Sequence, residues 1–342
     1  MNESVHQTAR RWRDYLGPAL LALAAIIVLA GGDAVYMYQL ALVGIYAIAA
    51  VGQQWLIGRT GQASVGGAAF MGIGAFTATA VAGHAWGVFP LPILAAAVAG
   101  GVVGLLLGLT TVRLRGLYLL LSTLALEYIA TFVMQEYEGQ NGGEFINFPK
   151  IGAFTFGQGE RYNLLLIVVL LIIVVGVQNL YRSATGRTWS AIRQNEEAAE
   201  VAGINVLGWK LIAFVGSSAI TAVAGAMYAY QLQSVSYQTF SLDLAISILC
   251  MVYLGGQYRI SGAILGAAVV TLLQFGLQQL DDTGSGGLSS WLTLNGPTLD
   301  TAIYGALLVL IMLFEREGIA QLLANLRDMV AAQVTRFRGE SA

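Results

Sequence analysis

Ten apolar stretches follow one another along this chain of 342 residues, and most approach the length of a membrane-spanning helix. About 20 apolar residues, rising 1.5 Å each, cross the roughly 30 Å of hydrocarbon in a bilayer. Charged residues make up only 11% of the chain, too few for a water-soluble surface. The sequence therefore predicts an all-α, polytopic transmembrane helix bundle of about ten spans, at 17–31, 34–57, 66–83, 91–112, 117–135, 162–181, 211–231, 242–256, 260–280 and 300–314.

The cations between these stretches predict the orientation of the chain, because Lys and Arg concentrate in cytoplasmic segments. With the N-terminus inside, fifteen of the 17 cations fall in inner segments. They are Arg10, Arg11, Arg13, Arg59, Arg113, Arg115, Arg182, Arg187, Arg193, Lys210, Arg259, Arg316, Arg327, Arg336 and Arg338. We therefore expect a cytoplasmic tail at 1–16, a transmembrane domain at 17–314 and a cytoplasmic amphipathic tail at 315–342, with both termini cytoplasmic.

Several kinds of chemistry are disfavoured by the residue content. The single Cys250 excludes a disulfide within the chain and a zinc site built on thiolates, and neither His6 nor His84 has a companion ligand, so we expect no metal. A net charge of −2 gives no basic surface for nucleic acid. The two lysines, Lys150 and Lys210, are not followed by the Ser or Thr of a phosphate-binding loop. We expect no catalytic residues and no cofactor.

The 182–210 segment is the only long inner connection, and it carries the run A-I-R-Q-N-E-E-A-A-E-V-A, which favours a helix ending at Gly203. Gly203 suits the left-handed turn that ends many helices. Ala198 and Ala199 are small enough for close docking of a partner, and Glu197 can pair with it. A short, rigid helix of this kind could transmit movement from a motor protein, although an exposed helix without a partner would fit the same residues.

Glu197, Ala198, Ala199 and Gly203 resemble the E-A-A-x-x-x-G loop of ABC importer permeases. Most of the chain is similar to the branched-chain amino acid permeases of the LivM type. The similarity includes G-Q-A-S-V-G-G-A-A-F-M-G-I-G-A-F at 61–76, R-L-R-G-L-Y-L-L-L-S-T-L-A at 113–125, G-R-T-W-S-A-I-R-Q-N-E-E-A-A-E-V-A-G-I-N at 186–205, M-V-Y-L-G-G at 251–256 and M-L-F-E-R-E-G at 312–318.

This resemblance implies a multi-pass transport subunit in the bacterial inner membrane, with branched-chain or related apolar amino acids as substrates. It also implies three protein partners: a second homologous permease subunit, two ATP-binding cassette subunits that hydrolyse ATP, and a periplasmic solute-binding protein. The lipid bilayer would surround the spans.

Polar residues in two apolar regions suggest a translocation path. Gln62 and Ser64 lie in a glycine-rich stretch, where small residues either pack helices or permit a broken, re-entrant backbone. Glu127 lies about ten residues into a span, where an unpaired charge would cost at least about 3 kcal/mol. It shares a helical face with Thr123, and Ser122 is adjacent. Glu127 could recognise the ammonium group of an amino acid, or it could form a structural hydrogen bond to a neighbouring helix.

Two other functions remain open at this point. A urea or short-amide ABC permease would share the same overall pattern. The sequence does not distinguish the two substrate classes, because residue types alone do not define the size or polarity of a cavity. An ion-coupled secondary transporter could use Glu127 as its ion-carrying carboxylate, although the E-A-A-x-x-x-G resemblance argues against it.

Overall fold

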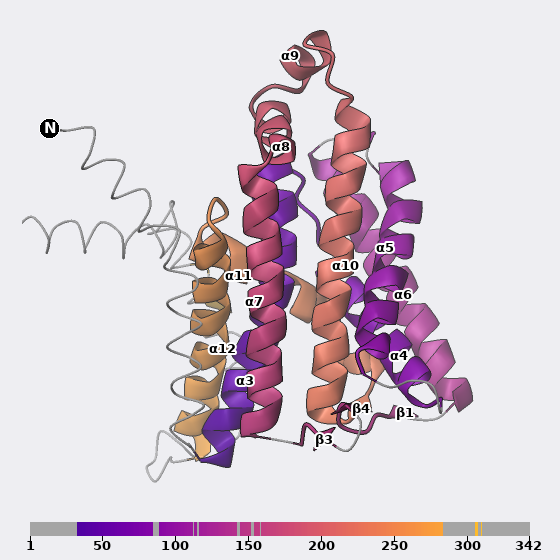
Figure 1. Cartoon of the computed structure of the whole chain (residues 1–342), viewed down its shortest axis with the longest axis vertical. Helices are drawn as coiled ribbons and strands as arrows, with labels where there is room; N and C mark the ends of the chain where they lie inside the picture. Colours follow the sequence, from indigo (N-terminus) through magenta and orange to yellow (C-terminus); the bar gives the residue numbers. More distant parts are fainter. Residues whose placement is uncertain are drawn as a thin grey trace, which may run out of the picture.

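The computed structural model describes residues 33–84, 89–111, 113–114, 116–141, 144–151, 154–157, 159–282, 305–306 and 309. Within them, long helices run side by side (Figure 1). Helices suit a membrane, because each satisfies its backbone hydrogen bonds without water. The helical elements are α3 (Ala34–Trp55), the π-helical η1 (Leu56–Thr60), α4 (Gly67–Ala82), α5 (Leu91–Thr111), α6 (Leu117–Asn141), α7 (Glu160–Arg182), α8 (Ala184–Gln194), α9 (Glu196–Val201), α10 (Val206–Leu232), the 3-10 turn η2 (Tyr237–Thr239), α11 (Leu242–Gly255) and α12 (Ile260–Asp282).

Eight of the predicted spans correspond to helices α3 to α7 and α10 to α12. Five helical stretches in the described residues are long and apolar enough to cross a membrane: 34–60, 91–111, 117–140, 160–182 and 206–232. The helices at 67–82, 242–255 and 260–276 are apolar but shorter. The predicted tails at 1–16 and 315–342 and the span at 17–31 lie outside the described residues, as does nearly all of the span at 300–314.

The prediction of a purely α-helical chain requires a small correction at one end of the bundle. Strand β1 (Glu144–Phe145) pairs antiparallel with β4 (Ser234–Val235), and β2 (Lys150–Ile151) pairs antiparallel with β3 (Phe154–Thr155). The β1–β4 pair connects the segments that follow α6 and α10, and the β2–β3 pair lies within the loop before α7. They lie at the opposite end of the molecule from α9 (Figure 1), consistent with the charge pattern, which assigns 136–161 and 182–210 to opposite sides of the membrane.

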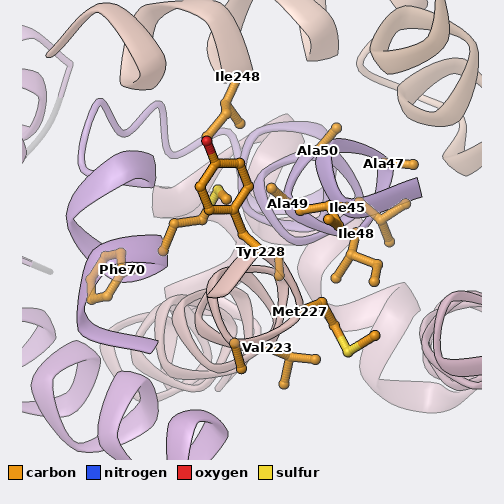
Figure 2. Close-up of a cluster of buried hydrophobic side chains, with 14 of the residues drawn as sticks. Ile45, Ala47, Ile48, Ala49, Ala50, Phe70, Val223, Met227, Tyr228 and Ile248 are labelled. Atoms are coloured by element: carbon orange, nitrogen blue, oxygen red, sulfur yellow. The ribbon is translucent and has the colours of Figure 1, made fainter. Parts of the chain in front are cut away.

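Helix α10 lies at the centre of the bundle and packs against α3, α4 and α5, while α12 packs against α3 and α11. The core combines small and large side chains. Ile45 and Ile48 of α3 are fully buried, as is Met227 of α10, and alanines of α3 let its neighbours approach closely. Figure 2 shows Tyr228 of α10 extending toward Ile248 of α11 within this cluster.

The crossing of α4 and α10 depends on glycine. A Cβ atom at Gly225 would lie 1.8 Å from the carbonyl oxygen of Met71, and one at Gly74 would lie 2.0 Å from that of Ala222. Any larger residue would push the two helices apart. The contact therefore fixes α4 against the central helix and sets where its first turn lies.

Candidate coupling segment and solute path

The predicted single helix in the 182–210 segment is two helices, α8 and α9. The break falls at Asn195, whose backbone is extended, with φ −160° and ψ 110°. Its side-chain oxygen accepts a hydrogen bond from the N–H of Ala198 at 3.1 Å, so Asn195 is the N-cap of α9. An Asn followed by acidic residues is a typical helix start. The prediction of one helix ending at Gly203 therefore overlooks a start signal at Asn195.

The end of α9 has the conformation that the sequence predicted. Gly203 has a φ of +84°. Its N–H donates to the carbonyl oxygen of Glu200 at 2.9 Å, and the N–H of Ile204 donates to that of Ala199 at 3.0 Å. This pair of hydrogen bonds is the Schellman motif, which satisfies carbonyl groups at the helix end and gives the turn a defined shape.

Two faces of α9 have different surroundings. Glu197, Ala198 and Val201 are exposed, and Val201 is 90% exposed, whereas Ala199 is only 5% exposed and packs into the core of its own chain. Of the two alanines expected to admit a partner, Ala198 alone lies on the open face. α9 therefore presents a small patch that is acidic at Glu197 and apolar at Val201.

The 182–210 segment is attached firmly to the bundle. Trp189 of α8 is 1% exposed, and its indole N–H donates to the carbonyl oxygen of Trp209 at 2.9 Å. Its ring meets the edge of Trp55, with centroids 5.2 Å apart. The buried ammonium group of Lys210 in α10 forms an ion pair and hydrogen bond with Glu196 of α9. A force on α9 would therefore act on the helices beneath it.

The glycine-rich stretch between α3 and α4 is not a continuous helix. The π-helical η1 ends at Gly61, where φ is +71°, and α4 begins only at Gly67. We call residues 61–66 the unwound segment. Gln62 and Ser64 are 3% and 2% exposed, whereas Gly61 is exposed, so protein covers only part of this irregular backbone. Membrane proteins tolerate such backbone where protein buries it or where it lines a water-filled cavity.

Two side chains of α6 hold the start of α4. The hydroxyl of Thr123 accepts a hydrogen bond from the N–H of Val65 at 3.0 Å, and Oε2 of Glu127 accepts one from the N–H of Ala69 at 2.8 Å. The first N–H groups of a helix lack partners within it and carry a partial positive charge, so a carboxylate is well suited to cap them. Glu127 thus makes the hydrogen bond to a neighbouring helix that the sequence left as an alternative.

The position of Glu127 indicates how far the unwound segment reaches into the bundle. Ten residues separate it from Leu117 at the start of α6, or about 15 Å at 1.5 Å per residue. The first turn of α4 therefore lies well inside the bundle. Ser122 is half-buried and points about 100° away from Thr123 around the α6 axis, so it lies apart from this contact.

Several buried polar atoms without a hydrogen bond belong to the elements on either side of the unwound segment. In the described part of the chain there are eight such side-chain atoms, and five belong to η1, to its flanking residues or to Glu127. They are on Gln53, Trp55, Arg59, Gln62 and Glu127, where the free atom of Glu127 is Oε1. Buried polar groups are costly unless they form hydrogen bonds, so each of these atoms is suited to contact water or a polar solute.

The chain can be compared with known proteins. The profile of a family described as "Branched-chain amino acid transport system / permease component" matches residues 35–312. The chain is 27% identical over 326 residues to the high-affinity branched-chain amino acid transport system permease protein LivM of Salmonella typhimurium, covering 87% of this chain and 72% of that protein. It is also 27% identical over 330 residues to LivM of Escherichia coli, with the same coverage.

A relative that matches less of the chain has a different stated substrate. The chain is 29% identical over 240 residues to the nucleoside ABC transporter permease protein NupC of Lactococcus lactis, covering 64% of this chain and 73% of that protein. Similarity of this kind therefore spans permeases for chemically different solutes.

Proposed function

The chain belongs to the branched-chain amino acid transport system permease component family, and we propose that it is the subunit of an ATP-binding-cassette importer that carries branched-chain or related apolar amino acids across the bacterial inner membrane. The similarity to two LivM proteins over 87% of the chain supports this substrate class. The nucleoside permease among the relatives makes the substrate the point that most needs a direct test.

The observation that carries this proposal is the open face of α9. An importer driven by a separate ATPase needs a rigid part that the ATPase can push. α9 is capped at Asn195, closed by the Schellman turn at Gly203 and tied to α10 through Glu196 and Lys210. Its exposed face, with Glu197 and Ala198, is free to enter a groove on the ATPase.

We expect the working complex to contain a second homologous permease and two ATP-binding cassette subunits beneath the bundle. A periplasmic solute-binding protein would dock at the opposite end, beside the short strands (Figure 1). This arrangement follows from family membership, and the separation of α9 from the strands is compatible with it.

The solute would pass the unwound segment. Gln62 and Ser64 lie in it, and Thr123 and Glu127 hold its far end against α6. Hydrogen bonding to Ala69 orients Glu127, which leaves Oε1 available to accept a hydrogen bond from a solute ammonium group. Ser122 is the weakest member of the proposed path, because it points away from Thr123.

The test is transport by the reconstituted complex. Vesicles containing the full complex and its solute-binding protein should accumulate radiolabelled leucine only when ATP is supplied on the cytoplasmic side. Unlabelled valine and isoleucine should compete, whereas urea and adenosine should not. Competition by urea or adenosine alone would assign a different substrate, and accumulation by the isolated chain on a proton or sodium gradient without ATP would refute the importer itself.

A further inference from the structure

The π-helical turn η1 lies between the 182–210 segment and the unwound segment. It continues directly from α3 and leads without interruption into residues 61–66. Single π-helical turns are rare in proteins and are frequent at functional sites, because one additional residue per turn loosens the regular hydrogen bonding. A movement of η1 would therefore also move the start of the unwound segment.

Arg193, in the last turn of α8, makes the contact from the 182–210 segment to η1. Its guanidinium donates a hydrogen bond to the carbonyl oxygen of Gly58. The side chain also runs beside the glycine that ends η1, since a Cβ at Gly61 would lie 3.5 Å from Cγ of Arg193. Only Asn195, the N-cap of α9, separates α8 from α9, so Arg193 lies three residues before α9 begins at Glu196.

The same arginine also contacts a third element, the turn between α11 and α12. Its guanidinium carbon lies 4.4 Å from the ring centroid of Tyr258, a cation–π distance. That turn packs directly on η1, because a Cβ at Gly58 would lie 2.0 Å from the carbonyl oxygen of Gln257. Arg193 therefore spans the junction of α8, η1 and the α11–α12 turn.

A second arginine, Arg59 of η1 itself, attaches η1 to Tyr181 of α7. The guanidinium carbon of Arg59 lies 4.1 Å from the ring centroid of Tyr181, and the Tyr181 hydroxyl donates to Oε1 of Gln54 at 2.9 Å. Nε2 of Gln54 in turn donates to the carbonyl oxygen of Gln257 at 2.9 Å. With α7 holding one side, a movement of α8 would change the shape of η1 instead of carrying it along as a rigid body.

We propose that Arg193 is a positioning residue that transmits the movement of α9 to η1 and so opens or closes the unwound segment. This inference rests on the proposed function, because it assumes that an ATPase acts on α9. Arg193 needs no contact with the solute. Its role is to keep the carbonyl oxygen of Gly58 in step with α8 as α8 moves.

The experiment compares Arg193→Met with Arg193→Lys in the reconstituted complex. Methionine keeps most of the length and removes the charge and all donors, whereas lysine keeps the charge on a single flexible ammonium group but loses the planar fork of donors. The matched control is Gln194→Ala, at the exposed neighbouring position. Each variant is measured for ATP-dependent leucine uptake, for ATPase activity and for the state of the unwound segment.

The state of the unwound segment is followed by chemical labelling. Ala63→Cys, at a half-buried position in this segment, is placed in a Cys250→Ala background, which removes the single native thiol. The rate of reaction with a membrane-impermeant maleimide is then compared between the ATP-free complex and the complex trapped with ATP and vanadate. A residue with a merely structural role would not alter the difference between these two rates while assembly remains normal.

We expect Arg193→Met to assemble and hydrolyse ATP, to lose leucine uptake by about tenfold or more, consistent with the loss of a charged hydrogen bond, and to show no change of labelling rate on trapping. Arg193→Lys should recover part of both readouts, and Gln194→Ala should match the parent. Parental uptake and a parental labelling change in Arg193→Met would overturn the inference.

If Arg193→Met does not assemble, Tyr258→Leu decides the question. Tyr258 is 60% exposed, so its replacement carries little risk to folding while removing the cation–π contact. Reduced uptake with a reduced labelling change would support the inference, and parental behaviour would overturn it. The two ideas fail separately: absence of ATP-dependent leucine uptake in the parent complex would refute the proposed function, whereas the outcomes above refute only the role of Arg193.

Discussion

The turn at Gly203 allows the importance of a rigid α9 to be measured as a graded series. With φ at +84°, Gly203 occupies the left-handed region, and a Cβ placed there would meet nothing within 4 Å. The cost of a substitution is therefore confined to the backbone. It is roughly 1–2 kcal/mol for an ordinary L-residue and larger for a β-branched one, while Asn tolerates this region best.

These costs predict an order of activity. A free-energy change of about 1.4 kcal/mol corresponds to tenfold in an equilibrium constant. In Gly203→Val, the equilibrium constant for forming the native turn from other backbone conformations should therefore fall at least about tenfold. ATP-dependent leucine uptake by the reconstituted complex should fall in the order Gly, Asn, Ala, Val. ATP hydrolysis in the Val variant should respond weakly to the loaded solute-binding protein.

A matched control separates the effect of the turn from the loss of a glycine. A Cβ atom at Gly176 in α7 would likewise meet nothing within 4 Å, and the backbone there is helical. Gly176→Val should therefore transport like the parent. If Gly203→Val also retains parental uptake and parental stimulation of ATP hydrolysis, the turn is not needed for coupling and the role assigned to α9 is wrong.

Three further outcomes are expected. Gly225→Ala should lower the unfolding temperature of the detergent-solubilised protein, because its Cβ would lie 1.8 Å from a carbonyl oxygen of α4 and overpacking costs about 1–3 kcal/mol. Gly176→Ala should leave the unfolding temperature unchanged. Equal unfolding temperatures in the two variants would contradict the close crossing of α4 and α10. Glu127→Gln should lower leucine uptake about tenfold with assembly intact, because the amide oxygen can still cap α4 but the charge is lost; full uptake would restrict Glu127 to capping. Glu197→Lys should weaken binding of the ATPase subunits and Gln194→Ala should not, so equal binding in both would exclude Glu197 from the docking face.

In the proposed solute path, the sequence marks Glu127 but not the group that it contacts. The sequence marks Glu127 because an unpaired charge inside an apolar span is costly, whichever helices surround it. Its partner could not be identified, because Ala69 lies 58 residues away and contributes only a backbone N–H. Every residue except proline has that group, so no side-chain pattern marks it.

In the sequence, Arg193 is only one of fifteen cations predicted to lie on the cytoplasmic side. Its hydrogen bond joins it to the carbonyl oxygen of Gly58, 135 residues earlier in the chain. Its second contact, the ring of Tyr258, comes from a turn that the sequence marked only as a boundary between spans. Nothing in the local sequence distinguishes this arginine from Arg187.

The sequence by itself determined the class of the protein, the helices at most of the predicted spans and the end of α9 at Gly203, because each depends on local properties: apolar length, charge placement and the left-handed freedom of glycine. Tertiary structure decided that Ala199 faces inward, that the backbone between Gly61 and Gly67 is unwound and that Glu127 caps α4. These depend on which helices meet, and helices of similar apolar composition carry little local information about their neighbours, so the choice is made by close packing and by buried polar groups that must find partners across the bundle.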